Sequence, residues 1–396
     1  MNVESRSPIE RRQSAGPSPV SRLIFAIASV FAICLPAAVP AFNLTPIYLE
    51  TENQLDGSSA NRVPPFLRPV VANLLDQFAD PAHEALTAVM FGCTGDFDAC
   101  GFSDANPEAF VPGGVLDGLR WNDNPIFRVS TRASNCRGGG APVFIDLDTD
   151  PLCWMTLFYD AGKRASGHPG EHFAGDRGNP PIALIYRVHY GDMQFLHSMA
   201  SWDGETAAVT QAHILSWIEF TYKLHDGEID DLDAPIVKQI PALAPIFERN
   251  GFSARSLMTP QALKASSDND ANLRAMALGS LLHTLEDSFS ASHAMRDPAL
   301  AQPTCDALPD APVPGRISAF YAYNHQDGNK HKARDQSSAA KGQADAAASV
   351  VAVGKRVLAL FDAGAPWSSA APYFACLFAI AVPATPAAPG SYAPEA

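Results

Sequence analysis

Several common features are missing from this 396-residue sequence. It has no internal repeat and no strand-rich region, which disfavours repeat and all-β architectures. It also has no glycine-rich phosphate loop, which disfavours the nucleotide-binding folds that use one. It has no CxxC pair, so a thiolate zinc site is disfavoured. Basic residues are few, with 28 Lys and Arg against 42 Asp and Glu and a formal net charge of −14. Such an acidic surface repels polyanions, so stable nucleic-acid binding is not expected.

One long apolar run is present, near the N-terminus. Residues 23–35 are apolar, follow a charged stretch that ends at Arg22, and precede small residues that continue through Ala41. This three-part layout is typical of a secretory signal peptide, and its core is shorter than the ~20 residues that span a bilayer. We therefore expect a signal peptide over 1–41, with Ala38 as a rival cleavage position, no later transmembrane segment, and a secreted or periplasmic protein.

The cysteines agree with export. Cleavage removes one of the seven cysteines and leaves an even number in an oxidising compartment, where disulfides are the default expectation. Proximity along the chain suggests three pairs, although other pairings remain open: Cys93 with Cys100, Cys136 with Cys153, and Cys305 with Cys376.

Apolar residues recur at helical spacing through most of the chain, which predicts an all-α fold, a multi-helix bundle in one domain over 42–378. Residues 93–181 are instead rich in Gly, Pro, Asp and Asn, and we expect a long loop-rich insertion held by disulfides. The Ala/Pro-rich residues 379–396 are expected to form a disordered tail. Trp217, Phe220 and Tyr222 are expected to be core residues rather than a choline-binding cage.

The most informative stretch lies late in a helical segment. His283 and Asp287 are four residues apart, so a helix places imidazole and carboxylate one turn apart on one face, where they can share a metal ion or form an ordinary surface pair. His293 can reach the same centre only from its flank or after a helix break, and Ser290 and Ser292 make such a break plausible.

Other histidines and carboxylates extend this pattern. His83 opens an earlier helix, and His331 and Asp335 repeat the HxxxD spacing. The order of these residues, with HxxxDxxxxxH between them, resembles the zinc-dependent phospholipase C family and its relatives, the single-strand-specific zinc nucleases. In that superfamily a helical core holds three zinc ions, and the last motif ends in Glu. Asp335 keeps the carboxylate but is one methylene shorter.

The resemblance implies a set of metal ligands. Asp287 would bridge two zinc ions, with His283 at one of them, and His83 would hold a third ion together with the backbone of a mature N-terminal Phe42. Asp123, which follows Trp121 as in the nucleases, and His197 would complete the first site. Asp192 is the alternative carboxylate and His189 the alternative histidine. The remaining site would be held by three residues: His293, His331 and Asp335.

The expected function follows from the same resemblance. It implies zinc-dependent hydrolysis of phosphodiesters by two or three ions, with Asp123 as a catalytic residue that orients or deprotonates the attacking water. Phospholipase C acting on a phospholipid, in transient contact with a membrane surface, is favoured because the chain is acidic. The alternatives are a single-strand-specific nuclease, which Trp121 and Asp123 favour, and an exported zinc-binding protein without catalysis.

Overall fold

The computed structural model describes most of the chain after residue 81. The chain divides into two units, Met1–Ala37 and Ala38–Ala396, and every described residue belongs to the second. The predicted signal peptide, its cleavage position and Phe42 lie outside the described residues, which are 82–94, 100, 109–129, 143–147, 151–167, 184–260, 266–297, 305, 308, 310–344 and 348–395.

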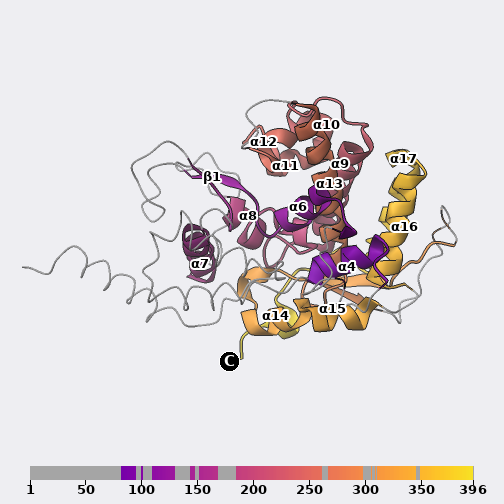
Figure 1. Ribbon diagram of the computed structural model, residues 1–396. Helices are drawn as coiled ribbons and strands as arrows, with labels where there is room; N and C mark the ends of the chain where they lie inside the picture. Colours follow the sequence, from indigo (N-terminus) through magenta and orange to yellow (C-terminus); the bar gives the residue numbers. More distant parts are fainter. Residues whose placement is uncertain are drawn as a thin grey trace, which may run out of the picture. The chain divides into compact units, whose positions relative to one another are not determined.

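The described residues are mostly helical, which confirms the coarse prediction of a helical protein (Figure 1). The helices are α4 (Ala82–Met90), α6 (Gly113–Trp121), α7 (Pro151–Gly167), α8 (Leu184–Tyr190), α9 (Ala207–Asp226), α10 (Ile236–Gln239), α11 (Ala244–Phe247), α12 (Ala254–Met258), α13 (Ser267–Asp287), α14 (Gly328–Asp335), α15 (Ser337–Ala344), α16 (Val350–Asp362) and α17 (Trp367–Leu377). Short 3₁₀ helices are η4 (Gln194–His197), η5 (Pro241–Leu243), η6 (Tyr323–His325) and η7 (Gly390–Tyr392).

Strands are confined to two small antiparallel hairpins among these residues. One pairs β1 (Phe127–Val129) with β2 (Val143–Ile145). The other pairs β3 (Ala294–Asp297) with β4 (Arg316–Phe320), and its register shifts between Met295 and Arg296. Neither is large enough to form a core of its own, so the helices supply most of the buried apolar surface.

Helix α13 is the element around which the site is built. It begins at Ser266, whose side chain accepts a hydrogen bond from the Asn269 amide, and Asp268 and Asp270 complement the dipole of its first turn. Its C-terminal half is buried against α6 and α9. A helix enclosed on several sides can bury polar side chains only where they meet partners, and this half carries His283 and Asp287.

Two glycines allow α6 and α13 to approach at backbone distance. A Cβ atom at Gly118 would lie 1.9 Å from the Met276 carbonyl oxygen, and one at Gly279 would lie 2.0 Å from the Val115 carbonyl oxygen. Any larger residue would push the helices apart. This close contact brings the end of α6 next to the last turns of α13.

The insertion over 93–181 contains more regular structure than predicted. Helices α6 and α7 and the β1–β2 hairpin all lie within it. The expectation of irregular loops failed for α6 because its glycines look like loop residues, whereas they serve the contact with α13. Val115, Leu116 and Leu119 are buried and supply the apolar face of that helix.

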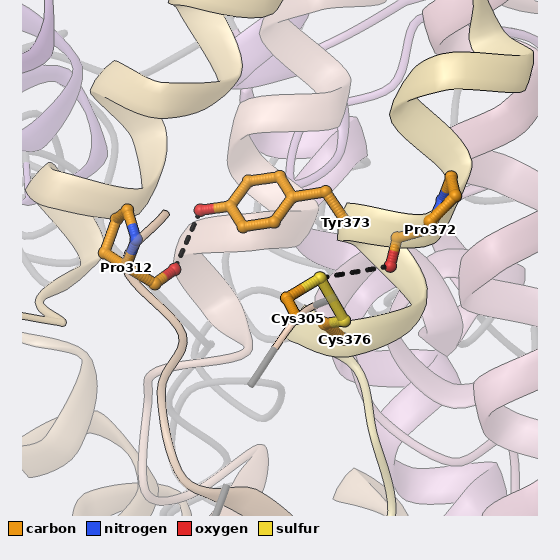
Figure 2. The surroundings of a disulfide bond; sticks show 5 residues. All are labelled: Cys305, Pro312, Pro372, Tyr373 and Cys376. Atoms are coloured by element: carbon orange, nitrogen blue, oxygen red, sulfur yellow. Dashed lines mark hydrogen bonds between the residues drawn. A yellow bond between two sulfur atoms is a disulfide. The ribbon is translucent and has the colours of Figure 1, made fainter. Parts of the chain in front are cut away.

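The predicted disulfides Cys93–Cys100 and Cys305–Cys376 are both present. The second links the segment before β4 to α17, where the Tyr373 hydroxyl also donates a hydrogen bond of 2.9 Å to the Pro312 carbonyl (Figure 2). Cys153 is disulfide-bonded as well, while Cys136, its predicted partner, lies outside the described residues.

The C-terminal segment differs from the prediction of a disordered tail. Ile380 forms a bridge with Ile317 of β4, Pro386 forms one with Thr206, and Tyr392 is buried within η7. The Ala/Pro composition gave a false signal because this segment is ordered by backbone hydrogen bonds to the rest of the fold rather than by an apolar periodicity of its own. No described helix combines the length and the apolar character needed to cross a membrane.

Candidate metal centre

Among the described residues, three groups of His and Asp side chains bring their ligand atoms within 4.8 Å of one another. Every member is buried, with at most 3% of its surface exposed. These buried groups could hold metal ions, since buried polar clusters of this kind are otherwise costly. The groups are His83, His283 and Asp287; Asp123, His189 and His197; and His293, His331 and Asp335.

Local folding explains how these residues meet. Helix α13 ends at Asp287, and the chain turns through Ser288–Ser292 so that His293 lies just before β3. The break that the two serines suggested is therefore present. His293 is held by pairing with the second hairpin, because the Tyr321 amide donates a 2.9 Å hydrogen bond to the His293 carbonyl.

Asp123 is positioned by the residue before it. The Asn122 side chain at the end of α6 donates to the Leu196 carbonyl at 3.0 Å, and the Ser280 hydroxyl on α13 donates to the Asn122 side chain at 2.6 Å. The end of α6 is thereby joined to both α13 and η4. No local pattern in the sequence marks Asn122, because the partners of this buried amide are distant along the chain.

Asp287 stands between two of the groups. Its Oδ2 atom lies 3.0 Å from Nε2 of His283 and 2.9 Å from Nδ1 of His197, while its Oδ1 atom lies 3.5 Å from Nε2 of His83. Oδ1 has no hydrogen-bond partner in the described part of the chain. One carboxylate thus turns its two oxygens toward different histidines, as a bridging ligand would.

Asp123 adds a further carboxylate to the set around Oδ2 of Asp287. Its oxygens lie 3.7 Å from Nδ1 of His197 and 3.8 Å from Nε2 of His283, and those two nitrogens are 3.2 Å apart. A tetrahedral zinc ion with bonds of about 2.1 Å separates its ligand atoms by about 3.4 Å. Spacings of 2.9 to 3.8 Å therefore fit one ion.

The third group is equally compact. Nε2 of His331 lies 2.7 Å from Oδ2 of Asp335, and Nε2 of His293 lies 3.3 Å from the same oxygen and 3.2 Å from Nε2 of His331. Asp335 is one methylene shorter than the Glu of the resembling family, yet its Oδ2 atom reaches both histidines. Its other oxygen accepts hydrogen bonds from the Ser290 and Ser292 hydroxyls.

Neighbouring acceptors orient the histidines, as is usual for metal ligands. Nδ1 of His83 lies 2.6 Å from a carboxylate oxygen of Glu286, whose other oxygen accepts from the Thr87 hydroxyl at 2.7 Å. Nδ1 of His331 is bonded to the Gln326 side chain. Neither acceptor was predicted from the sequence, although Glu286 stands directly before Asp287.

Burial and charge divide the centre into two electrostatic parts. Burial, followed by repulsion from Asp287, raises the pKa of Asp123 well above its usual value. Burial lowers the pKa of His197 to about 4, so this imidazole is neutral at pH 7. Burial disfavours charge on His293, but Asp287 and Asp335 outweigh it and raise its pKa to about 9.

The structure distinguishes the two alternative ligands, Asp192 and His189, from each other. Asp192 is excluded as a ligand because both its oxygens accept hydrogen bonds from Arg187, at 2.7 and 2.9 Å. The two rival histidines, His189 and His197, both lie beside Asp123. His197 also contacts Asp287 and His283, as the resemblance implied.

The aromatic residues predicted to belong to the core lie outside the three groups. Trp217, Phe220 and Tyr222 are fully buried core residues, which confirms that prediction. His213, His225 and His325 belong to none of the three groups, while His168 and His172 lie outside the described residues.

Comparison with family models, with curated proteins and with solved structures finds no match.

Proposed function

We propose that this chain is a zinc-dependent hydrolase of phosphodiester bonds, and specifically a phospholipase C that releases a phosphorylated headgroup such as phosphorylcholine from a glycerophospholipid. The observation that carries the proposal is the position of Asp287, whose two oxygens face different histidines within one buried centre. A structural metal site needs no shared carboxylate, whereas paired ions are characteristic of phosphate-ester hydrolysis.

The donor set fits zinc. It consists of imidazole nitrogens and carboxylate oxygens without a thiolate, and several of its buried atoms have no hydrogen-bond partner among the described residues: both oxygens of Asp123, Oδ1 of Asp287 and Nε2 of His197. When bound, a zinc pair lowers the pKa of water from 15.7 toward about 7 and neutralises charge on the phosphate.

The chain's own residues would divide the remaining work. Both oxygens of Asp123 lack a hydrogen-bond partner among the described residues and face His197 and His283, so Asp123 can orient the attacking water and accept its proton. Asn122 fixes the backbone from which Asp123 projects. Glu286 and Gln326 hold His83 and His331 in the orientation that aims their Nε2 atoms at the centre.

Charge favours a lipid over a polynucleotide as substrate. The formal net charge of −14 repels a polyanion, whereas a zwitterionic headgroup carries no net charge. A phospholipid in transient contact with a membrane surface is therefore the proposed partner. Export to the periplasm or the exterior is proposed from the N-terminal layout and agrees with the disulfides.

The test measures metal content by mass spectrometry together with two activities, phosphorylcholine release from phosphatidylcholine vesicles and cleavage of single-stranded DNA, before and after chelation. We expect two to three zinc ions and headgroup release that chelation abolishes and zinc restores. Asp123→Asn should abolish release, while Asp203→Asn, a change at the partly exposed Asp203–His325 pair, should retain it.

Other outcomes decide among the alternatives. Cleavage of DNA without headgroup release would assign the chain to nuclease chemistry. Zinc that raises the melting temperature without either activity would show a catalytically silent metal-binding protein. Protein that binds no metal would overturn the proposal as a whole.

A further inference from the structure

His189 on α8 lies against the centre, where ligand atoms of His189, Asp123 and His197 lie within 4.8 Å of one another. It is only 3% exposed. Phe158 and Trp154 of α7 pack edge-on against its ring, with ring centres 5.1 and 6.3 Å away, and so fix its orientation. A histidine held this firmly beside Asp123 and His197 calls for a chemical role.

The hydrogen bonding of His189 defines its tautomer. Nε2 lies 2.8 Å from the Asp123 carbonyl oxygen. A carbonyl only accepts, so Nε2 carries the proton and the neutral ring presents a bare lone pair at Nδ1. Among the described residues, the hydrogen-bond partner of this ring is the Asp123 carbonyl.

A similar arrangement recurs at four of the other histidines of the centre. Each of these four anchors one ring nitrogen on an oxygen and directs the other nitrogen toward a carboxylate, as metal-ligating histidines usually do. The anchored nitrogens and their acceptors are Nδ1 of His83 on Glu286, Nδ1 of His283 on the Leu119 carbonyl, Nδ1 of His293 on the His197 carbonyl, and Nδ1 of His331 on Gln326. His197 differs, because its Nδ1 lies 2.9 Å from Asp287 and its Nε2 has no hydrogen-bond partner among the described residues. His189 resembles the four in having one nitrogen held by an oxygen, but the held nitrogen is Nε2.

Ring spacing supports the same role. Two imidazoles on one tetrahedral ion, with bonds of about 2.1 Å, have ring centres about 5 Å apart. The His197–His283 and His293–His331 pairs are 5.1 and 4.9 Å apart, and the His189–His197 pair is 5.4 Å apart. Ligand atoms of Asp123, His189 and His197 also lie within 4.8 Å of one another.

We propose that His189 is a metal ligand through Nδ1, sharing with Asp123 and His197 an ion of this centre. The inference deepens the function proposed above and rests on it only in requiring that the centre binds metal. A positioning role, in which His189 does no more than hold the Asp123 carbonyl, is the competing explanation.

Two substitutions at the same position separate these roles. His189→Ala removes both ring nitrogens. His189→Gln keeps an amide N–H that can donate to the Asp123 carbonyl but removes the Nδ1 lone pair. The matched control is His213→Gln, because His213 packs on Phe195 and belongs to none of the metal-binding groups. Thermal unfolding of each metal-free variant verifies that the fold is retained.

The measurement is zinc affinity by chelator competition, together with the visible absorption spectrum of the cobalt-substituted full-length mature protein. In both His189 variants we expect the affinity for the zinc ion held by Asp123 and His197 to fall by more than about 100-fold. Losing only an outer hydrogen-bond partner costs about 10–100-fold. The cobalt bands should change in both variants, and His213→Gln should match the unaltered protein.

Affinity and spectrum restored by His189→Gln would overturn the proposal and establish the positioning role. Unchanged affinity in both variants would also overturn it. Because the readout is metal binding, the result is independent of catalysis: a protein that needs His189 for zinc but hydrolyses no phosphodiester would contradict the proposed function and leave this inference intact.

Discussion

Asp123 and Asp335 are equally buried aspartates of the same centre, at 3% and 1% exposure, yet their surroundings are opposite. Burial disfavours charge on Asp335, but His331 and His293 outweigh it and lower its pKa. Two serine hydroxyls also donate hydrogen bonds to it. Asp123 has no hydrogen bond to either oxygen within the described residues, and burial raises its pKa.

This difference shows how the centre is built. The Asp335 side supplies its own positive charge through His293, whose pKa is raised to about 9. The Asp123 side contains neutral imidazoles and an uncompensated carboxylate, so only a cation can compensate its charge. The two sides should therefore respond differently to loss of metal, to neutral substitution and to pH.

The largest expected effect is that of metal removal. An ion present at 100 to 1,000 times its Kd stabilises the native state by about 2.7 to 4.1 kcal/mol, so loss of two or three ions should lower the melting temperature strongly. Calorimetry with and without chelator, followed by zinc addition, measures the change. An unchanged melting temperature would contradict a metal-binding centre.

Gly279→Ala should rank next, because its Cβ would lie 2.0 Å from the Val115 carbonyl and force α6 away from α13. We expect about 3 kcal/mol of destabilisation in urea unfolding, at the upper end of overpacking costs. Binding of metal by Asp123 should weaken while the Asp335 side retains its ion. Gly342→Ala, where the added Cβ meets nothing within 4 Å, is the control and should be neutral or slightly stabilising.

Neutral substitution should separate the two aspartates directly. In metal-free protein at pH 7, Asp335→Asn should destabilise by about 1–3 kcal/mol because it removes a carboxylate that its partners stabilise. Asp123→Asn should leave stability unchanged or raise it, since burial opposes its charge. Chemical unfolding of both variants measures the difference, and equal destabilisation would argue against the division of the centre.

Counted per pH unit, the pH dependence is the smallest effect, about 1.4 kcal/mol for one proton. The pKa of His197 is lowered to about 4, so the unfolded chain binds its proton first and metal-free stability should fall as pH drops from 6.5 toward 4. The pKa of His293 is raised to about 9, so its contribution is present below pH 6.5 and is lost as pH rises toward 9. His197→Gln should flatten the acid side and His293→Gln the alkaline side of the stability profile.

Much of the centre could be predicted from local spacing. The HxxxD pairs at His283 and His331 could be predicted because helix geometry fixes which residues share a face. The helix break before His293 could be predicted from Ser290 and Ser292. The choice between His189 and His197 was not, because both lie near Asp123 only after α8 and η4 pack beside α6.

Other features were decided by side-chain contacts and packing. Asp192 was the alternative carboxylate ligand, but both its oxygens accept hydrogen bonds from Arg187. Helix α6 was predicted as a loop because it contains glycines, one of which, Gly118, allows close backbone contact with α13. The C-terminal residues resembled a disordered tail because their order comes from bridges to Thr206 and Ile317, far away in the sequence.

The sequence by itself determined the helical character of the protein, two of its disulfide pairs and the residues able to bind metal, because helical periodicity, cysteine proximity and i, i+4 spacing are local properties. Only the tertiary structure decided which carboxylate is held by an arginine, which is shared between histidines and which is left without a partner. The sharing of Asp287 depends on contacts between residues far apart in the sequence, such as His197 with Asp287. The pairing of Asp192 with Arg187 depends on side-chain orientations that the sequence does not specify, and burial affects the charge of all three carboxylates.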